Sequence, residues 1–206
     1  MKQSLVMIAA VVLLGCGKEA PEQQATQTPG MVAASKAYDE GRYADAVRLY
    51  TAELATEEAK PALSWVQLSH LNNELGLALD EAGQYDHALE YYQKDLAIRL
   101  KKLGADHPDV AISYNNIGLV YDDKGEYDKA LEYYQKSLAI RLKKLGPDHP
   151  NVAQSYHNMA YVYKAKKDPP KAKEYWEKAY AIFLKKLGPN HPYTKDTKAN
   201  LDALKE

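Results

Sequence analysis

The sequence predicts an all-α protein built as a solenoid of antiparallel helix pairs. Three observations support this prediction. The chain repeats itself with a period of 42 residues, apolar residues recur at helical spacing within each repeat, and glycine or proline interrupts the pattern at fixed points. One helix pair cannot bury its apolar faces alone, so neighbouring pairs are expected to stack.

The period is strict over long blocks of sequence. The segments EYYQK and LAIRLKKLG each occur twice, 42 residues apart, and His107-Pro108 recurs as His149-Pro150 and His191-Pro192. The first repeat is degenerate because it lacks the LGxDHP block that ends the second and third repeats. The predicted repeats are 29–66, 67–108, 109–150 and 151–192.

The third repeat shows the helix pair most clearly. Its first helix, near 108–124, carries an apolar stripe spaced i, i+3, i+4, i+7, and its second helix, near 127–145, repeats that stripe. Gly125 ends the first helix. Gly118 and Ala130 are small, and we expect them where the two helices approach closely.

The last two segments depart from the pattern. In the fourth repeat Lys167 replaces the repeat glycine. Residues 193–206 start another first helix, with Leu201 and Leu204 expected to face inward and Asp196 and the lysines to face outward. We interpret this segment as the polar capping helix that a solenoid end needs.

The N-terminus reads as an export signal. Lys2 precedes an apolar run from Leu5 to Leu14, far shorter than the roughly 20 residues of a membrane-spanning helix. Leu13-Leu14-Gly15-Cys16 resembles the lipobox of bacterial lipoproteins. The resemblance implies a signal peptide at 1–15, lipid and acyl chains such as palmitate on Cys16, and a flexible tether through residue 28.

That resemblance also predicts a location. With Gly17 rather than Asp after the cysteine, it favours the outer membrane, facing the periplasm. The alternative interpretation of Cys16 is a buried cysteine in an N-terminal helix.

Composition and motifs exclude several functions. Lys and Arg number 27 against 28 Asp and Glu, without the basic excess expected of a general nucleic-acid binder. A single cysteine excludes a disulfide framework. The three His-Pro histidines are predicted to act at turns and helix starts rather than on a metal. We find no phosphate loop and no nucleophile motif, so we predict no enzyme, cofactor or small-molecule substrate.

A basic stripe recurs near the ends of the second helices. We interpret it as a solvated outer face, with contact to anionic lipid or a partner as the alternative. The stripe comprises Arg99, Lys101, Lys102, Arg141, Lys143, Lys144, Lys185 and Lys186.

The repeat resembles the tetratricopeptide repeat over about residues 31–193. Its 42-residue length, the Asn115-Asn116-Ile117-Gly118 segment and the LGPDHP segment at 145–150 are most similar to the kinesin-light-chain type. The resemblance implies a right-handed superhelix that binds ligands in the concave groove of its first helices. The family positions matched in the third repeat are Tyr114, Ile117, Gly118, Tyr121, Ala130 and Tyr134.

By that resemblance, the groove is predicted to be lined by polar first-helix residues. The alternative is that these are ordinary solvated positions. The acidic pairs at the helix ends are expected to be exposed and to sit together after stacking. The predicted groove residues are Asn73, Asp80, Glu81, Asn115, Asn116, Asp122, Asp123, His157, Asn158, Tyr161 and Lys164.

The function predicted from these features is a membrane-anchored adaptor or assembly scaffold of the bacterial cell envelope. It would bind a protein or peptide, favouring basic segments because clefts of one sign attract the opposite charge. The alternative is a self-associating structural spacer without a peptide ligand.

Overall fold

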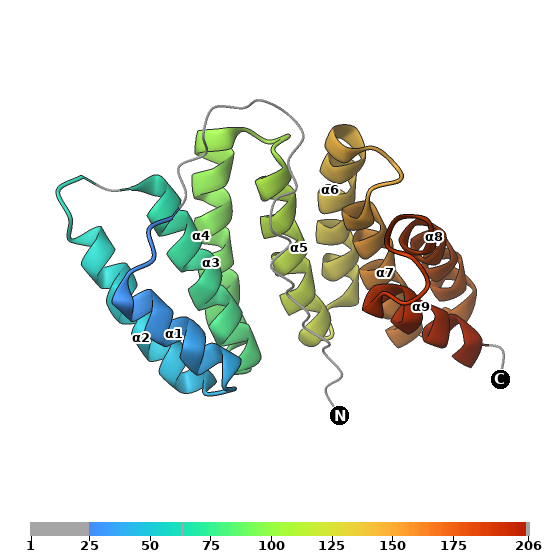
Figure 1. Cartoon of the computed structure of the whole chain (residues 1–206), viewed down its shortest axis with the longest axis horizontal. Coiled ribbons are helices and arrows are strands. Elements are labelled where there is room, and N and C mark those ends of the chain that lie inside the picture. Colours follow the sequence, from blue (N-terminus) through green and yellow to red (C-terminus); the bar gives the residue numbers. More distant parts are fainter. Residues whose placement is uncertain (1–24, 63, 205–206) are drawn as a thin grey trace.

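The computed structural model describes residues 25–62 and 64–204, whose regular structure is entirely helical (Figure 1). The predicted signal peptide and Cys16 lie outside the described residues. None of the described helices has both the length and the apolar character needed to cross a membrane. In order, the helices are α1 (Pro29–Asp39), α2 (Tyr43–Glu58), α3 (Trp65–Glu81), α4 (Tyr85–Leu103), α5 (Pro108–Asp123), α6 (Tyr127–Leu145), α7 (Pro150–Ala165), α8 (Pro169–Leu187) and α9 (Pro192–Ala203).

These helices pack as consecutive pairs, and Figure 1 shows the pairs standing side by side from α1–α2 at one end to α7–α8 and α9 at the other. The main contacts join helices that follow each other in the chain, and the first helices α5 and α7 also touch. The predicted all-α array of helix pairs is therefore confirmed.

Within each pair, an aromatic ring on the second helix lies against the backbone of the first. A Cβ atom added to Gly118 would lie 2.7 Å from Cε1 of Tyr134, and one added to Gly76 would lie 2.9 Å from the Tyr92 ring. Both rings are buried, with at most 1% of their surface exposed. Gly118 is thus a position of close helix approach, as the sequence predicted.

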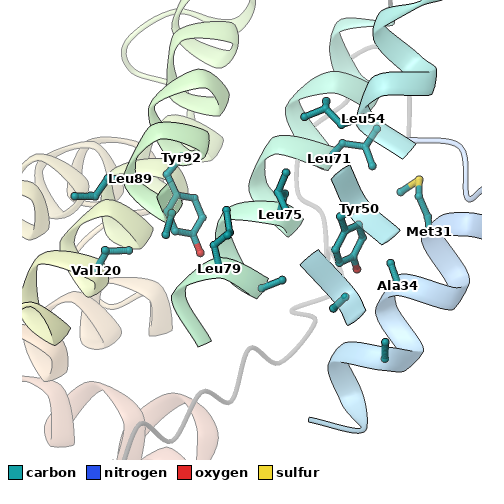
Figure 2. Packing of buried hydrophobic residues seen from close by; sticks show 14 of the residues in the cluster. Met31, Ala34, Tyr50, Leu54, Leu71, Leu75, Leu79, Leu89, Tyr92 and Val120 are labelled. Atoms are coloured by element: carbon teal, nitrogen blue, oxygen red, sulfur yellow. The ribbon is translucent and has the colours of Figure 1, made fainter. Parts of the chain in front are cut away.

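The same ring position recurs at both ends of the array. In the fourth pair Ala160 replaces the glycine and packs in one cluster with the buried ring of Trp176. Figure 2 shows Tyr50 of the first pair and Tyr92 of the second, each among the apolar side chains of its neighbours. One large ring per pair therefore runs through the core.

The three His-Pro histidines cap the first helices. His107, His149 and His191 occupy the N-cap positions of α5, α7 and α9, each followed by proline in the first turn. In each case Nδ1 accepts a hydrogen bond from the backbone N–H two residues later, at 3.1–3.2 Å. The histidines satisfy helix ends, as predicted, because the first N–H groups of a helix have no partner inside it.

The arginines of the basic stripe contradict the predicted outer face, because they fold inward. Only 4% of Arg141 is exposed, and burial lowers the pKa of its guanidinium to about 10. Its Nη1 donates to the backbone oxygen of Asn151 at 2.8 Å and to Oγ of Ser155 at 3.0 Å. Arg141 therefore ties α6 to the start of α7, in the next repeat.

Arg99 makes the equivalent tie one repeat earlier and adds an ion pair. Its Nη1 donates to the backbone oxygen of Asp109 at 2.9 Å, and its Nε to Oδ1 of the fully buried Asp95 at 2.7 Å. Ser69 and Ser113 also donate to the Asp95 carboxylate, from α3 and α5. This side-chain network joins three consecutive helices.

The lysines at the same end of the second helices remain exposed. Lys143 and Lys185 each form an ion pair with an aspartate in the loop before the first helix of their own pair. A second row of ion pairs joins lysines and aspartates at the opposite ends of the helices. These surface bridges connect successive repeats on both sides of the array. The pairs are Lys143–Asp106 at 2.5 Å, Lys185–Asp148 at 2.6 Å, Lys124–Asp86 at 2.5 Å and Lys166–Asp128.

The C-terminal helix α9 packs on the end of the array. Leu201 and Leu204 pack against the Trp176 cluster, so the predicted inward face is confirmed for these two residues. Asp196 was predicted to face outward, and that prediction is wrong. Its carboxylate bonds with His157 and Tyr161 of α7, because α9 occupies the place of a further first helix.

The turn between the helices of a pair requires a left-handed residue. Gly125 has φ +74°, and the equivalent position of the fourth pair holds Lys167 at φ +58°. A side chain in this region costs about 1–2 kcal/mol, chiefly by crowding Cβ against the carbonyl. A Cβ on Gly125 would meet no atom within 4 Å, so backbone conformation alone sets the cost there.

Lys167→Gly should therefore raise the free energy of unfolding by up to about 1 kcal/mol, less than the full strain because glycine is freer in the unfolded chain. The reciprocal change Gly125→Lys should lower it by a similar amount, up to about 1 kcal/mol, because lysine is less free than glycine in the unfolded chain. Urea unfolding followed by circular dichroism measures both. Equal stability of Gly125→Lys and the wild type would contradict the requirement for a left-handed residue.

Candidate functional site

The predicted groove residues lie on three consecutive first helices, α3, α5 and α7. Corresponding positions are 42 residues apart, so the stacked repeats place them in rows across the array. We call this surface the first-helix face. It comprises Asn73, Glu74, Asp80, Glu81, Asn115, Asn116, Asp122, Asp123, Asn158 and Lys164.

A ladder of amides crosses the first-helix face. Asn116 Nδ2 donates to Asn73 Oδ1 at 2.9 Å, and Asn158 Nδ2 donates to Asn115 Oδ1 at 3.1 Å. The asparagines thus bind one another across neighbouring repeats. Asn115 is only 5% exposed, so a ligand on this face would meet Asn73, Asn116 and Asn158 before it.

Glu74 ends this ladder and was missed from the sequence. It accepts from Asn73 Nδ2 at 3.2 Å and from the hydroxyl of Tyr50 at 3.4 Å. His70 Nδ1 lies 4.0 Å from the same carboxylate. The period would have found Glu74, because it occupies the same repeat position as Asn116 and Asn158.

Carboxylates from two first helices act on the same buried phenol. Burial, and after it the negative charges of Asp122, Asp123 and Asp80, raises the pKa of the Tyr134 phenol well above its usual value. The pKa of Tyr38 on α1 is likewise raised by burial and then by charges that include Glu81. Carboxylates from α3 and α5 therefore act together on this part of the molecule.

Asp80, Glu81 and Asp122 were predicted to be exposed, but all three are partly buried, so the prediction is wrong for them. Asp122 lies at the end of α5, and its neighbour Asp123 is exposed. Burial, followed by the charge of Asp123, raises the pKa of the Asp122 carboxyl to about 7. At neutral pH a carboxyl with this pKa is divided between its protonated and ionised forms.

The hydroxyl of Tyr134 lies within electrostatic reach of Asp122, Asp123 and Asp80. Its ring crosses α5 at Gly118, one helical turn before Asp122. The hydroxyl is buried and has no hydrogen-bond partner in the described residues, and the same holds for Nε1 of Trp176 in the next pair. Two buried donors without partners therefore sit at the ring position, an arrangement that costs stability unless something binds there.

His157 and Tyr161 were predicted to line the groove, but α9 engages both. His157 is buried, with Nε2 3.3 Å from Asp196 Oδ2 and Nδ1 3.0 Å from Thr197 Oγ1. Tyr161 donates to Asp196 at 3.0 Å and accepts from Asn200 at 2.8 Å. The hydrogen bond from His157 lowers the pKa of Asp196, so this contact favours a charged carboxylate.

Lys164 is exposed at the position equivalent to Asp80 and Asp122. Its Nζ lies 5.6 Å from the ring centre of Trp176, within reach of a cation–π contact. The face therefore combines carboxylates, amides and one ammonium. Within the described chain, no group of three or more His, Cys, Asp or Glu side chains is placed to hold a metal. What the arrangement can do is bind charged and hydrogen-bonding groups.

Comparisons with known proteins agree with this architecture. The family model described as Tetratricopeptide repeat matches residues 66–143, 123–185 and 151–201. No curated protein matches the sequence. Solved structures do, among them BtubC (BKLC) from P. vanneervenii, with a TM-score of 0.71 at 23% identity over 85% of this chain and 70% of that chain.

A second similar structure comes from Podosopora anserina and is described as a kinesin light chain with nearly identical TPR-like repeats. It gives a TM-score of 0.68 at 27% identity over 87% of each chain. A substituted form of the same protein gives 0.70 at 26% identity, over 85% of this chain and 82% of that chain. The predicted likeness to kinesin-light-chain-type repeats is confirmed.

Asp122→Asn should stabilise the protein more at pH 8 than at pH 5. The Asp122 carboxyl has a pKa of about 7 in the folded state against an ordinary 3.8. The folded state therefore keeps a proton that the unfolded state loses, so stability declines as pH rises from about 4 to about 7 and stays reduced above. Asparagine removes this decline, with a gain at pH 8 on the order of a few kcal/mol.

Urea unfolding of the wild type and the variant between pH 5 and 8 measures the effect. Asp123→Asn is the matched control. It should change the pH profile less, because burial contributes more than the Asp123 charge to the raised pKa of Asp122. Parallel pH profiles for wild type and Asp122→Asn would contradict the buried carboxyl.

Proposed function

Because the chain belongs to the tetratricopeptide repeat family, whose matches span residues 66–201, we propose that it is a protein-interaction adaptor that binds an extended segment of a partner along the first-helix face. Its partner site would be the concave groove that the family uses. The observation that carries this proposal is that carboxylates of α3 and α5 act on the same Tyr134 phenol, on first helices whose asparagines bond to each other.

The chemistry of the face favours a partner segment that carries Lys or Arg. Negative charges gathered on one surface raise the local concentration of cations and speed association. The exposed part of the amide ladder offers both donors and acceptors, which suits the backbone of an extended segment. We therefore propose a basic peptide or protein segment as the ligand and no reaction on it.

The proposal includes a lipid anchor at Cys16, in the envelope of a bacterium and at the outer membrane. The described chain begins pinned to α3, the first helix of the second pair: Gln67 Nε2 donates to the backbone oxygen of Thr26 at 2.9 Å, and Thr26 N–H donates to Gln67 Oε1 at 2.8 Å. From Cys16 to Ala25 the chain can span at most about 30 Å. An anchor at Cys16 would keep the α1–α3 end close to the membrane.

Replacing the four acids Asp80, Glu81, Asp122 and Asp123 with Asn or Gln should weaken binding of Lys- and Arg-containing peptides by about tenfold or more, because charge pairs across an interface can contribute more than about 1 kcal/mol. Wild-type affinity should fall with added salt, which screens exposed charges within about 10 Å at 0.1 M. A peptide array, followed by titration of the best peptides, measures both effects.

The matched control neutralises four exposed acids on second helices, Glu90, Glu132, Glu174 and Glu177. It should leave peptide affinity unchanged. The proposal fails if acidic or purely apolar peptides bind best and the groove variant binds them as well as wild type. Concentration-dependent self-association without any peptide binding would favour the spacer instead.

Cys16→Ser should leave the precursor uncleaved or release the product from membranes, because serine lacks the thiol that would carry the lipid. Cell fractionation and mass measurement of the mature N-terminus follow the change. Gly17→Ala serves as a control that keeps the thiol and should leave the protein at the membrane. Membrane association of Cys16→Ser equal to wild type would contradict the lipid anchor.

A further inference from the structure

The charge of the first-helix face changes sign along the array. One position, four residues after the glycine or alanine that meets the ring, holds Asp80 in α3, Asp122 in α5 and Lys164 in α7. Two consecutive repeats thus offer a carboxylate and the next offers an ammonium.

Lys164 is available to a ligand. It is exposed, and in the part of the chain that the structure describes it forms no ion pair, whereas Lys124, Lys143 and Lys185 are all paired with aspartates. The charge of Lys164 acts on Asp196 of α9 and, after the hydrogen bond from His157, helps to lower the pKa of that carboxyl, but the Asp196 carboxylate already bonds with His157, Tyr161 and Asn200. The Trp176 ring holds the ammonium by a cation–π contact instead.

The acidic end also holds a buried polar group without a hydrogen-bond partner. The Tyr134 hydroxyl is fully buried, lacks a hydrogen-bond partner in the described chain, and lies within electrostatic reach of Asp122, Asp123 and Asp80. Carboxylates crowded in one place repel each other, and an added cation relieves that repulsion. This end of the face is therefore suited to an ammonium or guanidinium group.

The amide ladder fixes the spacing between the two ends. Direct hydrogen bonds join α3 to α5 and α5 to α7, so neighbouring first helices lie at packing distance, about 8–10 Å between axes. An extended peptide rises about 3.3 Å per residue. Moving from the Asp122 position to the Lys164 position therefore takes about three residues.

We propose that the ligand is bipolar: it carries Lys or Arg against α3 and α5, and a carboxylate about three residues away against Lys164. This inference rests on the proposed peptide-binding function. It adds that a purely basic segment is a poorer ligand than one with charges of both signs in this order. The carboxylate can belong to an Asp or Glu side chain or to a chain terminus.

The test titrates the full chain, in neutral detergent, with synthetic 12-residue peptides. One peptide has two lysines separated by three residues from two glutamates, one has lysines at all four places, and a third has the lysines and a free terminal carboxylate at the glutamate position. The first two have amidated C-termini. Wild type should prefer a bipolar peptide over the basic peptide by about fivefold, comparable to one exposed ion pair. Which bipolar peptide binds better identifies the source of the carboxylate.

Lys164→Glu should reverse this preference and Lys164→Gln should abolish it. Lys173→Glu makes the same charge change on the exposed outer side of α8 and should alter nothing. Thermal unfolding confirms that each variant is folded. If the wild type and all variants prefer the basic peptide, the bipolar inference is wrong, whereas groove binding stands. If no peptide binds the wild type, groove binding itself is wrong.

Discussion

The contact between a first-helix backbone and a second-helix ring determines the geometry of the rest of the molecule. Where Gly118 has no side chain, the Tyr134 ring fills the space, and the separation of α5 and α6 follows from the thickness of that ring. The same contact carries the phenol across α5 to the neighbourhood of Asp122. Core packing and the electrostatics of the first-helix face are thus two results of one close approach.

The interfaces between successive repeats differ more than the repeated letters suggest. Two equivalent positions on the second helices show this difference: they hold an ion pair in α4, a serine and an arginine in α6, and two apolar residues in α8. A buried ion pair adds little net stability but is costly to break, whereas the last interface relies on ring stacking, with Phe183 and Tyr193 centred 5.3 Å apart. This pair of positions therefore becomes less polar toward the C-terminus. The successive pairs are Asp95–Arg99, Ser137–Arg141 and Ala179–Phe183.

The period and the helical stripes predicted the helices, the histidine caps and the close approach at Gly118, because these depend on neighbours a few residues away. The prediction failed where exposure depends on another repeat. Arg141 reads as a surface residue, yet its long side chain bends back to the start of α7. His157 matches Asn73 and Asn115 in register, but α9 covers it. Such differences arise from contacts with the next helix, and the position of a residue within its repeat does not reveal those contacts.

The lysine–aspartate ion pairs are weak contacts between successive repeats. They join successive repeats at both ends of the helices, through Lys143–Asp106 on one side and Lys124–Asp86 on the other. Each bridge is exposed and weak, about 0–1 kcal/mol, and salt weakens it further. The apolar core lies between these two rows of weak ion pairs. Ionic strength therefore changes these contacts on both sides of the array, while the apolar contacts between them keep the repeats together.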